Sequence, residues 1–180
     1  TVELYWPPEE NETDPANLHW HVLPDISGGG RFVDVGCHQL DFLDYVFGPI
    51  VSVQGQAANQ AGYYPAEDIV SASFRFESGV IGSGLWCFIV SDAWKTDTMT
   101  IVGEDGQIVF SGFDPIPIRL ETAQEANEYT PRWPGHVEQP LIQAVVDELQ
   151  GRGKCPSTGI SAARTTWVID EILHDWRAKK

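Results

Sequence analysis

The feature that most constrains the fold is the spacing of the apolar residues, which changes twice along the 180-residue chain. In 31–47 they recur every three or four positions, which predicts a helix. From residue 50 to about residue 130 they recur every second position, which predicts strands. The helical spacing returns in 136–150 and again in 157–177.

Turn residues divide the region of period two into about five or six strands. Ser78-Gly79 predicts one hairpin and 104–106 a second, and a further short strand is expected at 1–6. The chain is therefore expected to form one α+β domain over 1–180. Its open, mostly antiparallel sheet would carry helices packed on one face. The chain does not alternate strand and helix, as a doubly wound nucleotide-binding sheet would.

The charge of the chain argues against two classes of partner. Acidic residues outnumber basic ones 26 to 11, which gives a formal net charge of −15. A nucleic acid needs a basic patch, and the basic residues cluster only at 177–180, so no nucleic-acid partner is expected. An anionic membrane surface would repel the chain as well, and no apolar run approaches the roughly 20 residues of a membrane span.

The cysteines indicate the compartment. Cys37, Cys87 and Cys155 are odd in number and far apart, which is typical of unpaired thiols in a reducing environment, and we expect a cytoplasmic protein. Their plainest role is as small buried hydrophobic residues. The chain opens in a strand without an initiator methionine or a signal pattern, and we expect it to be part of a longer protein.

One motif could support acid–base chemistry. The triple glycine 28–30 would let the backbone bend tightly and approach a ligand. Asp34 and His38 follow, one helical turn apart, so an α-helix would place both side chains on one face. A carboxylate beside an imidazole orients the ring and favours its protonated form, as a general acid–base requires. The simpler alternative is that Asp34 caps the helix and His38 is a surface residue.

A metal site is an alternative hypothesis. His19 and His21, with Asp34 and His38, are residue types that bind zinc or iron. The chain has no second paired motif, and the histidines could equally pack in an aromatic cluster around Trp20, so no metal is expected. A dinucleotide fingerprint would need a third glycine and a preceding strand, so we also expect no cofactor site in this chain.

The strands predict a second subunit. They are apolar on both faces, as Ile81, Leu85 and Ile89 show, whereas the helices would cover only one face. The simplest cover for the other face is another copy, which predicts a homodimer through the sheet. Cover by residues 1–27 of the same chain is the alternative.

The segment from His19 to Gly48 resembles the start of the second domain of the Gfo/Idh/MocA oxidoreductases. The run Gly151–Ile160 and the last helix also resemble that family, so the resemblance covers nearly the whole chain. In the family, a glycine hinge leads into a helix bearing Asp-x-Gly-x-His-x-x-Asp. The matching residues here are Gly28, Gly29, Gly30, Asp34, Gly36, His38 and Asp41.

The resemblance implies a domain of the dihydrodipicolinate-reductase-like C-terminal type, which binds substrate and dimerises through its sheet. It also implies an N-terminal Rossmann domain, outside this chain, that binds NAD or NADP and supplies the lysine of a Glu-Lys-Pro motif. Hydride would pass between the nicotinamide and a carbon of a sugar or polyol. The isolated chain is expected to be inactive because it holds only half of such a site.

By the same resemblance, His38 would be the acid–base, and Asp34 would orient it or hold a neighbouring hydroxyl. Substrate contacts are expected from Trp20, His21, Gly30 and Asp41; His21 stands where some members carry an arginine. Two alternatives stay open: a non-catalytic binding or assembly module on the same fold, and a metal-dependent enzyme.

Overall fold

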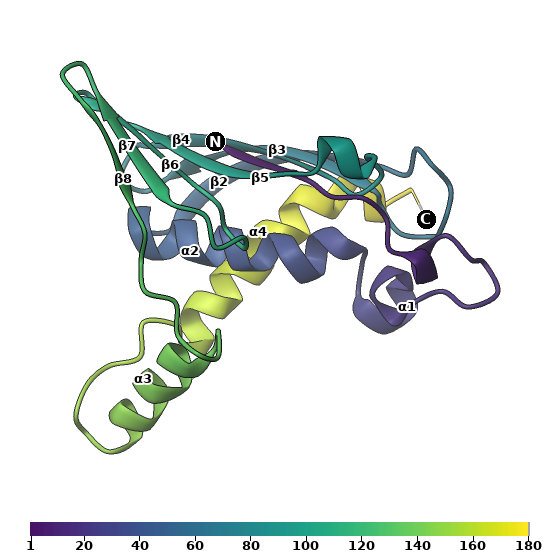
Figure 1. Cartoon of the computed structure of the whole chain (residues 1–180). Helices are drawn as coiled ribbons and strands as arrows, with labels where there is room; N and C mark the ends of the chain where they lie inside the picture. The colour runs from purple at the N-terminus through teal and green to yellow at the C-terminus, as the bar shows by residue number, and fades with distance from the viewer. Residues whose placement is uncertain (180) are drawn as a thin grey trace.

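A computed structural model describes residues 1–179 and contains one eight-stranded sheet (Figure 1). The strands are β1 (Val2–Tyr5), β2 (Ile50–Ala58), β3 (Ile69–Phe76), β4 (Ile81–Cys87), β5 (Thr96–Val102), β6 (Gly106–Phe110), β7 (Ile118–Thr122) and β8 (Ala126–Tyr129). Their order in the sheet is β2-β3-β4-β1-β5-β6-β7-β8. Every neighbouring pair is antiparallel except β1 and β4. The predicted open, mostly antiparallel sheet is confirmed. The region from residue 50 onward forms seven strands in place of five or six, and β1 is the further strand expected at 1–6.

The N-terminal strand lies in the middle of the sheet. Val2 pairs with Gly84 on one side and with Met99 on the other. Val2 and Leu4 are fully buried, which explains how a strand of four residues holds a central place. β1 therefore joins the β2–β4 meander to the β5–β8 meander.

The helices are α1 (Pro24–Ser27), α2 (Cys37–Phe47), α3 (Gln139–Leu149) and α4 (Gly159–Arg177). Short 3-10 turns occupy Glu10–Glu12, Trp20–Val22 and Asp92–Trp94. α2 and α4 lie on the same face of the sheet, as predicted, and α4 runs beneath β2 (Figure 1). A π-helical turn, Phe32–Gly36, leads directly into α2. No helix within residues 1–179 combines the length and the apolar character needed to cross a membrane.

The main core lies between the sheet and these two helices. Phe74, Phe76 and Trp86 of the sheet share one buried cluster with Ile172 and Leu173 of α4. On the α2 side, Phe76 packs against Phe47 and Trp86 bonds to Gln39. Trp167 belongs to the apolar spacing that predicts a helix over 157–177, but it is 42% exposed. Its place is taken by residues on the face that α4 turns toward the sheet. The buried apolar residues of α4 are Val168, Ile169, Ile172 and Leu173.

α3 differs from the other two long helices because it projects away from the sheet (Figure 1). Its sequence has the predicted apolar stripe, but none of its residues is buried. Leu141, Ile142 and Leu149 are exposed. Packing within residues 1–179 therefore does not cover this stripe.

Candidate functional site

The triple glycine packs against the loop that precedes β3. The Gly30 amide donates a hydrogen bond to Glu67 Oε1 at 2.7 Å. A Cβ atom at Gly30 would lie 2.6 Å from the carbonyl oxygen of Glu67 and 3.0 Å from Ala66 Cβ. Gly28 has a φ of +81°, the left-handed region that glycine adopts without strain. The glycines thus allow a close approach of backbone to the buried Glu67 carboxylate.

Arg31, which follows the triple glycine, is held by a buried carboxylate and two aromatic rings. It is buried, and its Nη1 lies 3.2 Å from Oε2 of Glu12, which is 1% exposed. The guanidinium also lies over the rings of Trp6 and Phe88, with its Cζ 5.3 and 5.2 Å from their centroids. A buried cation needs such partners to offset its lost hydration. This pair ties the acidic 7–17 loop to the start of the helix that carries Asp34 and His38.

The structure pairs Asp34 with His21. Asp34 Oδ2 lies 3.8 Å from His21 Nδ1, and both side chains are partly exposed. In residues 1–179 no hydrogen bond or ion pair joins Asp34 to His38. The reason is the π turn 32–36, which contains Asp34. A π turn bonds i to i+5, so a spacing of four across it no longer aligns two side chains as an α-helix does.

The segment around Trp20 is an aromatic cluster. The ring of His21 lies 3.9 Å from that of Trp20 and 4.3 Å from that of His19, measured between centroids. Trp20 is 49% exposed, so it can contact a ligand as well as its neighbours. In the described part of the chain, His, Cys, Asp and Glu side chains nowhere gather in threes as metal ligands would.

Asp41 bonds to the helix packed beside its own. Its Oδ1 accepts a hydrogen bond from Thr165 Oγ1 at 3.2 Å, and its Oδ2 accepts one from Ser157 Oγ at 3.4 Å. One turn further along α2, Asp44 forms an ion pair with Arg164. These bonds fix α2 against the start of α4, and Asp41 is absent from the residues that line the groove described next.

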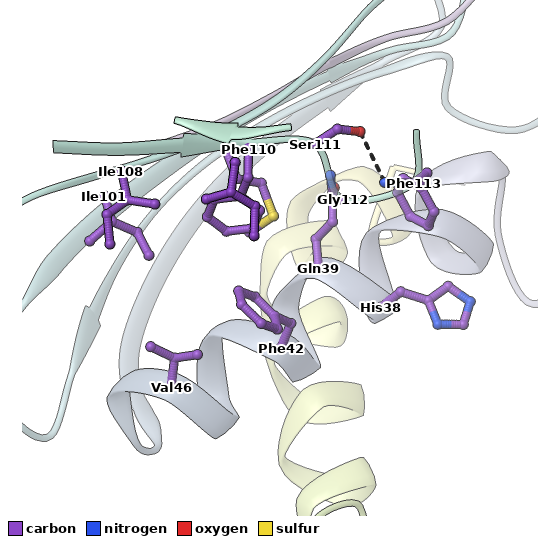
Figure 2. Close-up of a pocket in the computed structure, with 12 residues that line it drawn as sticks. His38, Gln39, Phe42, Val46, Ile101, Ile108, Phe110, Ser111, Gly112 and Phe113 are labelled. Carbon is purple, nitrogen blue, oxygen red and sulfur yellow. Dashed lines mark hydrogen bonds between the residues drawn. The ribbon is translucent and has the colours of Figure 1, made fainter. Parts of the chain in front are cut away.

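His38 stands at one end of a groove between α2 and strands β5 to β7 (Figure 2). The groove has a volume of about 490 Å³, within the size range of pockets that hold small ligands. The His38 ring lies beside that of Phe113, with centroids 6.2 Å apart. Its long wall is apolar and is formed by Phe42, Val46, Met99, Ile101, Ile108, Phe110 and Ile118. Its polar end is formed by His38, Gln39 and Ser111.

Sequence reasoning missed Asp97, which builds the turn beside His38. Asp97 is buried and accepts hydrogen bonds from Ser111 Oγ and from the amides of Gly112 and Phe113. One signal was available in the sequence. In a pattern of period two, Asp97 shares the inward face of β5 with buried Met99, and an acidic residue at such a position calls for a partner.

Cys37, next to His38, is not an activated nucleophile. Burial raises the pKa of its thiol, and the nearby Asp34 carboxylate raises it further. A raised pKa leaves little of the reactive thiolate at neutral pH. The prediction that the cysteines are buried is confirmed for Cys155, whereas Cys37 and Cys87 are only partly buried.

With the geometry in place, comparison with known proteins defines the family. The profile of the GFO/IDH/MocA C-terminal domain matches residues 2–109. The curated relative Oxidoreductase P35 of Formosa agariphila is 32% identical over 157 residues, which are 86% of this chain and 47% of that protein. The chain therefore belongs to the GFO/IDH/MocA C-terminal domain family. It spans about half the length of this relative.

Solved structures share the fold at low sequence identity. The aldose–aldose oxidoreductase from Caulobacter crescentus, complexed with glycerol, has a TM-score of 0.79 and 15% identity; the match covers 99% of this chain and 53% of that one. Levoglucosan dehydrogenase, in complex with NADH and levoglucosan, has a TM-score of 0.76 and 18% identity, covering 99% and 56%. The chain thus shares the fold of about half of each of these two structures.

Proposed function

We propose that this chain is the substrate-binding and dimerisation domain of an NAD(P)-dependent oxidoreductase acting on a hydroxyl or carbonyl of a sugar or polyol. The observation that carries the proposal is the position of His38. This residue of the family's helix motif stands at the polar end of the groove beneath β5–β7. NAD or NADP would be bound by a separate Rossmann domain, since this chain lacks the glycine-rich fingerprint. The bound nicotinamide would supply the hydride chemistry.

The work of this chain would be to hold the substrate oxygen and move its proton. When an alcohol carbon loses hydride, its oxygen must lose a proton, and an imidazole nitrogen of His38 would accept it. In the reverse direction the same nitrogen would return the proton to the carbonyl oxygen. Histidine suits both directions because its ordinary pKa lies near neutral pH.

We further propose a role for each of the other residues of the motif, based on their contacts. Asp34 faces His21 and is partly exposed, so we assign Asp34 to a substrate hydroxyl rather than to the orientation of His38. His21 and the half-exposed Trp20 would lie on the same side of the substrate. Gly30 and Asp41 already bond to Glu67 and to α4, and we assign them to the frame of the site.

The test is His38→Ala in the full-length protein, assayed for reduction of NAD or NADP with a panel of sugars and polyols. Turnover should fall by about 10²- to 10⁴-fold, the usual contribution of a general acid–base. Tyr45→Phe is the matched control, because Tyr45 lies on the same helix and is 68% exposed. Unchanged turnover in His38→Ala would remove His38 from the mechanism and would favour a non-catalytic binding module on this fold.

A homodimer through the sheet is the second part of the proposal. Within residues 1–179, no α-helix covers the face opposite α2 and α4 (Figure 1). On that face Gln54, Ser73 and Ser83 lie side by side in register, and Ile81 is 78% exposed. The two serines are small enough to let a second sheet approach closely, and Ile81 offers it an apolar contact.

Sedimentation of the full-length protein checks this association. We expect a dimer, weakened by Ser73→Lys, which would place a charge in the middle of the packed face. Because the 180 residues that would form the interface carry a formal charge of −15 in each protomer, dimerisation should strengthen with salt. A monomer at high protein and salt concentration would contradict the proposed interface.

A further inference from the structure

The turn 111–114, between β6 and β7, closes the polar end of the groove (Figure 2). Its amides point away from any strand ladder and toward Asp97. Gly112 N and Phe113 N donate to the Asp97 carboxylate at 3.2 and 2.7 Å, and Ser111 Oγ donates to it as well. Ser111 Oγ in turn accepts from the amides of Phe113 and Asp114 at 3.2 and 2.7 Å. The turn is therefore folded around the Asp97 carboxylate, which is 7% exposed, and the Ser111 hydroxyl bonded to it.

The same carboxylate is bonded to the helix that carries His38. Gln39 Nε2 donates to Asp97 Oδ1 at 3.4 Å, and Gln39 Oε1 accepts from Trp86 Nε1 at 2.7 Å. Gln39 is 2% exposed and directly follows His38 in α2. The bonds run from the core of the sheet through Gln39 to Asp97 and on to the turn. Such fully bonded buried networks fix geometry, because each broken bond leaves an unpaired polar group.

The turn delivers one side chain to His38. The Phe113 ring meets the His38 imidazole edge to face, with centroids 6.2 Å apart and planes at 83° (Figure 2). Phe113 also packs against Trp6 at 5.3 Å. These are the separations of favourable aromatic pairs, so the contact restricts how the imidazole can turn.

We propose that Asp97 is a positioning residue for His38, which it orients through the 111–114 turn and the ring of Phe113. This rests on the proposed function only in that His38 is the acid–base there. Asp97 touches neither substrate nor cofactor. It sets the direction of the imidazole nitrogen that exchanges the proton, and a displacement of about 1 Å at such a group can cost about 10²-fold in rate.

The experiment uses three variants of the full-length protein. Phe113→Leu removes the ring and leaves the turn, Asp97→Ala releases the turn, and Asp97→Asn keeps one acceptor oxygen. Ile172→Ala is the control for lost stability, because Ile172 is buried beside Gly55 of β2 and is not among the residues that line the groove. Two quantities are measured: the NMR resonances of the His38 ring protons, assigned with His38→Gln, and kcat and KM for the substrate.

Phe113→Leu and Asp97→Ala should both move the His38 resonances, because the ring current of Phe113 is removed or displaced. Both should lower kcat by about 10- to 100-fold with little change in KM, and Asp97→Asn should restore part of each effect. Ile172→Ala should leave the resonances unmoved at a comparable loss of melting temperature.

Two results would overturn the positioning role: unmoved His38 resonances in Asp97→Ala and Phe113→Leu, or a fall in kcat no larger than in Ile172→Ala. If Asp97→Ala does not fold, Phe113→Leu and Asp97→Asn still decide the question. If the wild-type protein transfers no hydride, the proposed function fails. The His38 resonances of the variants would still test whether Asp97 and Phe113 position the ring.

Discussion

The core beneath the sheet and the region around the candidate site are held together by different forces. Under the sheet, buried side chains such as Leu4, Phe76 and Leu173 are apolar. Around the site, several fully or nearly fully buried side chains carry a charge. These residues are Glu12, Arg31, Glu67, Asp68 and Asp97.

Each kind of burial has its own consequence. Apolar packing is non-directional and responds little to pH, so it stabilises the fold without fixing individual bonds. Buried charged groups are costly unless fully paired, and their bonds have defined geometry. Asp68, for example, holds the amides of Gln60 and Ala61 at 2.8 and 2.7 Å. The polar region therefore determines where the ends of loops and helices lie, which an acid–base site requires.

The largest effect should come from the apolar core. Leu173→Ala removes a fully buried side chain from α4 and should lower the free energy of unfolding by about 2–5 kcal/mol. The substitution removes no ionisable group, so the loss of stability should be nearly equal at pH 6 and pH 9. Urea denaturation followed by tryptophan fluorescence measures it at both values.

Ile160→Ala is the control for Leu173→Ala, since Ile160 lies on the same helix and is 74% exposed. Its effect should stay within about 0.5 kcal/mol. A loss below about 1 kcal/mol for Leu173→Ala, or a loss that changes strongly with pH, would contradict the view that apolar packing stabilises the region beneath the sheet.

Periodicity predicted most of the fold because the sheet core is apolar. Strands β3 and β4 alternate buried and less buried residues, and this alternation is visible in the sequence. The two hairpins follow from turn residues; Gly79 has a φ of +90°, which glycine tolerates. β7 begins at Ile118 although Ile116 continues the same alternation, because Pro117 between them has no amide to donate to a ladder.

The arrangement of the helices was harder to predict. The sequence shows an apolar stripe on α3 but not whether anything covers it. The π turn before α2 depends on packing: a Cβ at Gly36 would lie 2.7 Å from the ring of Phe32. Spacing alone therefore predicted an Asp34–His38 pair, and the structure pairs Asp34 with His21 instead.

The frame of the site could not be predicted because its bonds join distant residues. Glu67 is 37 positions from Gly30, and Gln39 is 58 positions from Asp97. Local patterns carry no information about such pairs. Sequence resemblance brought out His38 and Asp34, whereas only the fold shows that Asp97 and Glu67 support the segments around them.

The smallest effect at neutral pH should come from Tyr64, in a second, minor core with Val22 and Ala66. Its hydroxyl is buried without a hydrogen-bond partner in the described part of the chain. Tyr64→Phe removes that unpaired group and should raise the free energy of unfolding by about 1 kcal/mol at pH 7. The change in the free energy of unfolding would thus be opposite in sign to that of Leu173→Ala. A loss of stability in Tyr64→Phe would show that the hydroxyl has a hydrogen-bond partner.

Tyr64→Phe also tests how the stability of the buried polar region changes at alkaline pH. Burial raises the pKa of Tyr64, and the carboxylates of Glu12 and Asp68 raise it further. Because the folded-state pKa lies above the unfolded value of about 10, the stabilisation linked to the neutral hydroxyl is complete below that pH and is lost as the pH rises above it. Tyr64→Phe should therefore lose less stability than the wild type between pH 9 and pH 11, whereas Tyr129→Phe, at a residue that is 52% exposed, should follow the wild type. Parallel curves for wild type and Tyr64→Phe in urea titrations across this range would mean that the minor core admits water to the phenol, which would place Tyr64 outside the buried polar region.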